Sequence, residues 1–243
     1  MKKIILLVIL TLASIVGINA YANSFGVSPS KKGNRPNMDA SIIEDNNGKW
    51  IGNDDKKIYL TFDCGYENGY TLDILNTLKE NDVKAIFFIT GHYLDSSSDI
   101  VKKMIDEGHI IGNHTTSHKD FTKSSDEEIL KDIKSLEDNF YIKFNIPMSK
   151  YVRPPRGEYT LASQRLLNNN GYKSVFWSLA YVDWNKDTYH GNHYSYNKVM
   201  NKIHNGAVIL MHTVGKDNAV DLDDIIKGLK NEGYIFSSID ELF

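Results

Sequence analysis

A single cysteine, Cys64, is all that the 243-residue chain contains, so no internal disulfide can form. Small secreted domains that rely on disulfides carry an even set of cysteines. This fold must therefore be held together by its hydrophobic core. The 41% content of hydrophobic residues and the length of the chain are sufficient for such a core, and one domain with a short extension is expected.

Basic clusters are also missing. The chain has four arginines, no run of lysines or arginines longer than a pair, and a formal net charge of -3. A nucleic-acid-binding surface needs a concentration of positive charge that releases counterions from phosphate. Nucleic acid is therefore excluded as an expected partner.

The N-terminus has the pattern of a secretory signal. Lys2 and Lys3 precede an apolar-biased run from Ile4 to Ile18, and Ala20-Tyr21-Ala22 supplies the small-x-small pattern of a cleavage site. We expect residues 1–22 to be a signal peptide, whose two lysines would take the net charge from -3 to -5 on removal (-3 - 2). An uncleaved signal anchor is the alternative. Either way, we expect the body of the protein to lie outside the cytoplasmic membrane.

Residues 23–55 are polar and interrupted by glycine and proline, which predicts an extended linker that packs loosely on the domain. From residue 56 to 243, short β-branched and aromatic runs alternate with segments of helical periodicity. The expected strands are Ile58–Phe62, Ala85–Thr90, His109–Gly112, Lys150–Arg153, Ser174–Leu179, Ala207–Met211 and Tyr234–Phe236. The expected helices are Thr71–Asn81, Ser98–Glu107, Ser125–Phe140, Leu161–Asn169, Asn197–His204 and Val220–Asn231.

This alternation predicts an α/β domain with a parallel sheet and crossover helices. Periodicity alone leaves open whether the sheet closes into a barrel or stays open and doubly wound. Polar residues gather where the expected strands end, and in a barrel all these ends open onto one face, where active sites lie. These residues are Asp63, His114, His118, Arg153, Arg156, Asp183 and His212.

Four of these residues have a second interpretation. The His-x-x-x-His spacing of His114 and His118 puts both rings on one side of a helical turn, able to share a metal, but solvated or capping histidines fit it too. Position 115 is not glutamate, so the zinc-protease signature is absent. Asp63 is either a turn former or a placed acid or base, and His212 is either catalytic or a core residue. The RPPRG segment, with two of the four arginines and two of the five prolines, suits the holding of carboxylates.

Five ordered motifs carry a family resemblance: TFDCGYENG, GNHTTSH, RPPRG, VDW and ILMH. Over Lys56 to Phe243 the chain resembles the polysaccharide deacetylases of carbohydrate esterase family 4, also called the NodB homology domain. The TFD-x-GYENGYT opening, RPPRG in place of the commoner RPPYG, and FWSLAYVDW resemble one branch, the delta-lactam-biosynthetic de-N-acetylases of endospore formers. The resemblance implies a distorted (β/α) barrel of about seven strands.

The resemblance also implies roles for the strand-end residues. Asp63 would be the general base, oriented by Arg153, and His212 the general acid, tuned by Asp183. His114 and His118 would hold a divalent metal, with zinc as the expected ion, and the backbone N–H of Arg156 would help to hold the oxyanion. Amide hydrolysis needs these groups because an amide is a poor electrophile and an amine a poor leaving group.

Cys64 departs from the family pattern, in which the residue after the base is an aspartate that ligates the metal and, in this branch, tends to be asparagine. A Cys64 thiolate could complete a Cys-His-His zinc site. Alternatively, the side chain points into the sheet as a small buried hydrophobe. A third interpretation, Cys64 as nucleophile with His212 as base, would leave Asp63 and the two histidines without a role.

The branch resemblance implies a substrate and partners. The substrate would be a peptidoglycan strand whose N-acetylmuramic acid has lost its stem peptide, so an upstream muramoyl-alanine amidase is implied, and the product would lead to muramic-δ-lactam in spore cortex. Trp184, which follows Asp183, is the expected sugar-stacking residue. Two alternatives remain: an N-acetylglucosamine deacetylase of intact wall, and a catalytically weak glycan-binding module.

Overall fold

The computed structural model describes residues 23–243, so the expected signal peptide, residues 1–22, lies outside the described residues. The nine strands of the described part are β1 (Asn23–Ser24), β2 (Lys57–Cys64), β3 (Ile86–Ile89), β4 (Ile110–Asn113), β5 (Tyr151–Val152), β6 (Glu158–Tyr159), β7 (Lys173–Ser174), β8 (Val208–His212) and β9 (Ile235–Phe236). The α-helices are α1 (Ser41–Glu44), α2 (Thr71–Glu80), α3 (Gly91–Ser96), α4 (Ser98–Asp106), α5 (Asp126–Phe144), α6 (Leu161–Asn169), α7 (Tyr194–Met200) and α8 (Lys216–Asn231).

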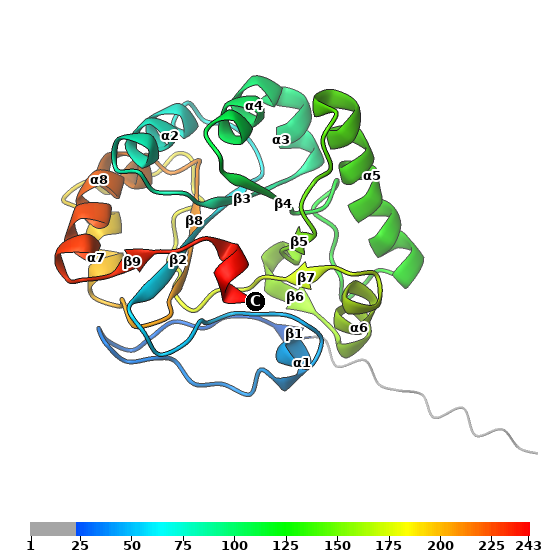
Figure 1. Cartoon of the computed structure of the whole chain (residues 1–243), viewed down its shortest axis with the longest axis horizontal. Coiled ribbons are helices and arrows are strands. Elements are labelled where there is room, and N and C mark those ends of the chain that lie inside the picture. Colours follow the sequence, from blue (N-terminus) through cyan, green and yellow to red (C-terminus); the bar gives the residue numbers. More distant parts are fainter. Residues whose placement is uncertain (1–22) are drawn as a thin grey trace, which may run out of the picture.

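Seven of the strands form one parallel sheet in the order β7-β5-β4-β3-β2-β8, with β9 also paired to β2. Figure 1 shows that this sheet is curled and that the helices lie around its outside. The central strand β2 is buried along all but its first residue, as expected for a parallel strand covered on both faces. Among the described helices, none is both long enough and apolar enough to cross a membrane.

The curled sheet forms a distorted barrel, which confirms the fold expected from the family resemblance. Its edge strands are β7 and β8, and the irregular chain after β7 bridges them. On one side, Val175 N–H donates to Val152 O at 2.9 Å; on the other, Leu210 N–H donates to Leu179 O at 2.9 Å. The carboxyl ends of the sheet strands consequently face one common space.

All seven expected sheet strands are present, with shifts of their bounds, and the six expected helices match α2, α4, α5, α6, α7 and α8. Ser125 caps α5 through the expected capping box with Glu128. The sequence analysis missed the short elements α1, α3, β1 and β6. Each has six residues or fewer, too few to show a periodicity.

Residues 23–55 do not form the loosely packed linker that was expected. β1 pairs antiparallel with β6, and Phe25, Ile43 and Trp50 are buried in one hydrophobic cluster with residues of the sheet. The Arg35 guanidinium donates to the backbone carbonyls of Gly52, Asn53 and Asn205. In Figure 1 this blue segment runs along the lower side of the barrel. The sequence prediction was wrong because the few apolar residues of this segment are too widely spaced to give a periodic pattern.

Candidate active site

A cleft of about 980 Å³ lies at the carboxyl ends of the sheet strands. Of the expected site residues, Asp63, His114, His118, Arg156, Trp184 and His212 line it. Its remaining wall comes from the N-terminal segment Phe25–Ser28, from loops after the strands, and from the aromatic rings of Tyr66, Trp177 and Tyr181. The structure therefore brings six residues, widely separated in sequence, to one concave surface.

Asp63 and Arg153 form a buried ion pair at the base of the cleft. The Arg153 Nη1 atom lies 2.8 Å from Asp63 Oδ1, and the arginine side chain is fully buried. Arg153 also donates to the carbonyl oxygens of Val175 and Phe176, so its guanidinium is fixed on three sides. Burial alone would raise the pKa of Asp63, but the Arg153 charge, assisted by His114 and His212, holds that pKa below its ordinary value. Asp63 is consequently an ionised carboxylate at neutral pH.

His114 is held as a neutral imidazole. Its Nδ1–H donates to the carbonyl oxygen of Arg153 at 2.8 Å, because a carbonyl can only accept. Burial, which the Asp63 charge offsets only in part, lowers the pKa of His114 to about 4. The Nε2 lone pair is left facing the cleft, 3.6 Å from Asp63 Oδ2. Histidines that bind a metal through one ring nitrogen usually donate the N–H of the other ring nitrogen to a carbonyl or carboxylate, as His114 does here.

His118 lies beside His114, but not on a helical turn as expected. Thr115 and His118 adopt positive φ angles of 66° and 56°, and the segment between them is an irregular loop. The two imidazole rings nevertheless lie with centroids 5.0 Å apart. Burial and the Arg156 charge lower the pKa of His118, which keeps a lone pair available. The loop, rather than a helix, brings the pair together.

His212 and Asp183 form a second pair, with His212 on the strand next to that of Asp63. Asp183 accepts from the His212 backbone N–H at 2.8 Å and from its Nδ1–H at 2.7 Å. Burial alone would lower the pKa of His212, but the Asp183 carboxylate outweighs it and raises that pKa above its ordinary value. The Trp184 ring, more than half exposed, stands edge-on to His212 with centroids 5.7 Å apart.

Arg156 lies at the rim of the cleft on a sharp turn, where Arg156 and Gly157 both have positive φ. A side chain at Gly157 would meet the Trp177 ring at 2.7 Å, so glycine is required there. The Arg156 guanidinium pairs with Glu158 and Asp120. It is the only Lys or Arg side chain among those that line the cleft.

Cys64 is separated from the two histidines. Successive residues of a strand point to opposite faces, so Cys64 and Asp63 diverge. The thiol is fully buried in the cluster with Phe62 and Ile74, away from the cleft lining. Burial raises the pKa of the Cys64 thiol, which disfavours the thiolate that a metal or a nucleophilic mechanism requires. Of the alternatives that the sequence left open, the geometry matches the small buried hydrophobe and does not join Cys64 to the metal site.

The donor set of the cleft fits a divalent metal in part. His114 and His118 offer two neutral imidazoles, and the Asp63 carboxylate lies next to them. Within residues 23–243, no group of three or more His, Cys, Asp or Glu side chains is arranged to hold an ion. Of the described residues in the cleft, His114 and His118 are the pair that would hold a divalent metal.

Some residues of the site were not found from the sequence. Asn218, in the first turn of α8, donates to both Asp183 and His212. Asn68 donates to the carbonyl oxygens of Lys186 and Val214 and so ties together two loops beside the cleft. Asparagine in a loop or at a helix start has many structural uses, and no spacing distinguished these two.

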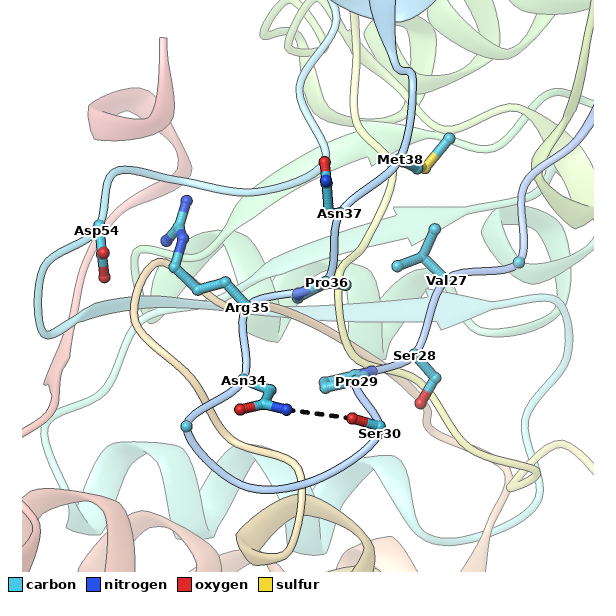
Figure 2. Close-up of a pocket in the computed structure, with 12 residues that line it drawn as sticks. Val27, Ser28, Pro29, Ser30, Asn34, Arg35, Pro36, Asn37, Met38 and Asp54 are labelled. Atoms are coloured by element: carbon cyan, nitrogen blue, oxygen red, sulfur yellow. Dashed lines mark hydrogen bonds between the residues drawn. The ribbon is translucent and has the colours of Figure 1, made fainter.

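A second cavity of about 710 Å³ adjoins the cleft on the far side of Gly26–Ser28. Figure 2 shows that it is bounded by the N-terminal segment, with the Asn34 amide donating to Ser30. The Arg35 guanidinium beside this cavity donates to three backbone carbonyls, so its hydrogen-bond donors are used to hold the segment in place.

The geometry agrees with the comparisons with known proteins. Residues 51–175 match the family model described as polysaccharide deacetylase. The chain belongs to the polysaccharide deacetylase family. It is 44% identical over 206 residues to the peptidoglycan-N-acetylmuramic acid deacetylase PdaA of Bacillus subtilis, covering 83% of this chain and 77% of PdaA.

A further relative and a solved structure agree with this assignment. An uncharacterized 30.6 kDa protein of Geobacillus stearothermophilus is 50% identical over 194 residues, covering 79% of this chain and 73% of that protein. The solved structure of B. subtilis PdaA, a family 4 carbohydrate esterase, superposes with a TM-score of 0.87 at 40% identity, covering 91% of this chain and 97% of that one. The family predicted from five short motifs is thereby confirmed.

Proposed function

We propose that this deacetylase removes the N-acetyl group from muramic acid residues of peptidoglycan that carry no stem peptide, and that its product leads to muramic-δ-lactam in spore cortex. The observation that carries the proposal is a pair of dyads, Asp63–Arg153 and His212–Asp183, at one cleft. Asp63 and His212 are paired in register at the ends of the adjacent strands β2 and β8, and both line the cleft. The 44% identity to PdaA supports muramic acid as the sugar.

The two dyads divide the chemistry of amide hydrolysis. The ionised Asp63 takes a proton from water as the water oxygen bonds to the acetyl carbon. His212, protonated through its pairing with Asp183, then gives its Nε2 proton to the nitrogen as the C–N bond breaks. Acetate and a free sugar amine result. A positively charged neighbour keeps the base ionised, and a negatively charged neighbour keeps the acid protonated, at the same pH.

His114 and His118 would hold the divalent metal on which deacetylases of this family generally depend, and zinc is the first ion to test. The chemistry that such an ion supplies is polarisation of the acetyl carbonyl and of water. The turn at Arg156 would offer its backbone N–H to the oxyanion, and the exposed Trp184 ring would stack on a sugar face.

The cleft supports a substrate that carries a carboxylate. Arg156 Nη1 has no hydrogen-bond partner among the described residues, whereas Nε and Nη2 bond Glu158 and Nη2 also pairs with Asp120. A peptide-free muramic acid presents a free lactyl carboxylate, which this guanidinium could attract. Once the acetyl group leaves, the amine lies next to the same carboxyl, and ring closure benefits from a high effective molarity. A stem peptide would block that carboxyl, so an amidase must act first.

The decisive assay compares peptidoglycan strands pretreated with a muramoyl-alanine amidase with untreated strands, by mass spectrometry of the muropeptides. We expect loss of acetyl groups from muramic acid only in the pretreated strands. Equal rates on untreated strands, or release from N-acetylglucosamine, would reassign the protein to a wall deacetylase. The variant Asp63→Asn should abolish product and retain glycan binding; a parent protein that binds but gives no product with any divalent metal would be a binding module.

We also propose that residues 1–22 direct export, since peptidoglycan lies outside the cytoplasmic membrane. Mass measurement of the protein recovered from the cell wall distinguishes cleavage after Ala22 from a retained anchor.

A further inference from the structure

Asn218 uses its whole hydrogen-bonding capacity next to the His212–Asp183 dyad. The side chain is fully buried in the first turn of α8. Its Nδ2 donates to Asp183 Oδ2 at 2.7 Å and to the His212 carbonyl oxygen at 2.8 Å. Its Oδ1 accepts from the Tyr181 hydroxyl at 2.7 Å and from the Ser195 hydroxyl at 2.6 Å.

The orientation of this amide is fixed by its partners. A carboxylate and a backbone carbonyl can only accept, so the nitrogen of Asn218 must face them and its oxygen must face the two hydroxyls. With two donated and two accepted hydrogen bonds, no capacity of the amide remains for another group. A flipped amide would set oxygen against oxygen at the dyad, at a high cost in a buried site.

Asp183 depends on such support because it lies in a segment without helix or strand. Its Oδ1 receives the His212 ring and its Oδ2 receives the His212 backbone N–H. Asn218 adds a third donor that comes from a helix. The same helix start is pressed against Asp183, since a side chain at Gly215 would lie 2.7 Å from the Asp183 carbonyl oxygen.

We propose that Asn218 is a positioning residue for the general acid: it locks the Asp183 carboxylate and the His212 backbone to α8, and thereby aims the His212 imidazole at the leaving nitrogen. This inference rests on the proposed role of His212. Asn218 lies in α8, outside the family motifs. Its hydrogen bonds would give Asp183 and His212 a rigid support that these motif residues do not have on their own.

The chemistry offers a readout that a purely structural residue would not change. An amide nitrogen leaves only with a proton, whereas the 4-nitrophenolate of 4-nitrophenyl acetate leaves without one. A misplaced His212 therefore slows amide hydrolysis and spares ester hydrolysis. Because both substrates report on the same folded molecules, the ratio of the two rates does not depend on the folded fraction.

The test compares N218D and N218A with S195A, using the metal-loaded enzyme, 4-nitrophenyl acetate, and amidase-treated peptidoglycan. N218D keeps the size of the side chain but replaces the donor by an acceptor, and N218A removes all four contacts. S195A is the matched control, because it removes one bond to the Asn218 oxygen and leaves both donor contacts. We expect the amide-to-ester ratio to fall at least ~10-fold in both Asn218 variants, a part of the roughly 10²–10⁴-fold contribution of a general acid, because His212 is displaced and not removed. In S195A the ratio should stay within about twofold of the parent. An unchanged ratio in N218D and N218A would overturn the inference.

A second measurement separates this inference from the proposed function. In the parent protein, the His212 Nδ1–H that donates to Asp183 should give a downfield proton resonance, assigned by its loss in H212N. The resonance should move or broaden in N218D and stay in place in S195A, whatever glycan the enzyme uses. If the parent hydrolyses no muramoyl amide, the proposed function fails while this signal still decides the inference, and a resonance that N218D leaves unchanged would refute it.

Discussion

At the scale of residues, the site keeps two ionisable groups in opposite protonation states within one cleft. Burial acts on both and would make both neutral. The Arg153 charge overcomes burial at Asp63, and the Asp183 charge overcomes it at His212. A carboxylate that stays ionised and an imidazole that is more readily protonated than usual follow from these two partners.

Arg153→Met is expected to damage both catalysis and stability. Without the guanidinium, burial dominates and the pKa of Asp63 rises, so the acid limb of the kcat/KM profile moves to higher pH. In the parent, the lowered pKa of Asp63 contributes stability that is present above its unfolded value of about 3.9 and is lost as pH falls through the folded value. Leaving the buried carboxylate unpaired should cost about 3–5 kcal/mol.

Urea unfolding and pH–rate profiles measure these effects. The exposed Arg165→Met is the matched control and should change neither. An acid limb that stays in place in Arg153→Met would show that Asp63 does not limit the reaction at low pH.

Cys64→Ser is expected to leave the metal content of the purified enzyme unchanged, since the thiol lies in the core and not with the histidines. The variant should instead lose about 1–2 kcal/mol of stability, because a hydroxyl with a weak partner replaces a sulfur in an apolar site. Elemental analysis and urea unfolding test the two parts. A sharp loss of zinc would return Cys64 to the set of ligands.

At the scale of elements, β1 and Phe25 link the N-terminal segment to the catalytic loop. The Phe25 N–H donates to Gly157 O at 2.9 Å, and its ring contacts Phe176 and Trp177, with centroids 4.8 and 5.2 Å away. The turn at Arg156 is therefore held in place by contacts with the N-terminal segment, which lies outside the five motifs.

Phe25→Ala should consequently lower both stability and turnover. Removing the buried ring is expected to cost about 3–5 kcal/mol and to loosen the turn that carries Arg156. The measurements are urea unfolding and kcat on the pretreated strands. Ile142→Ala, at a side chain that is 78% exposed, is the control with little expected effect. A stable Phe25→Ala variant with parental kcat would contradict the supporting role of β1.

The elements that could be predicted from the sequence are those with a repeating apolar pattern. The run from Ile58 to Phe62 and the helix at Leu161–Asn169 have such a pattern and were located. The loop at His114–His118 could not be predicted, because its shape depends on two left-handed residues, neither of them glycine. The spacing of the histidines was informative about their proximity and misleading about their secondary structure.

At the scale of the whole molecule, the position of a polar residue relative to the strands determined whether it could be predicted from the sequence as a site residue. Residues that directly follow a strand, such as Asp63 and His212, are marked by the apolar run before them. Asn218 comes six residues after His212, in the first turn of α8, and no apolar run directly precedes it to mark it as a site residue. Phe25–Ser28 reach the cleft through one short antiparallel pair. Long-range packing of this kind cannot be deduced from a single sequence.

The Asp63–Arg153 pair has a mechanical consequence for the barrel. Asp63 is on β2 and Arg153 follows β5, with β3 and β4 between them in the sheet. In a flat sheet those strands would be about 14 Å apart, yet the two side chains meet at 2.8 Å. The ion pair thus connects two strands across the concave face of the curled sheet, and it resists the separation of these strands. The two charges therefore join distant strands of the sheet in addition to forming part of the cleft.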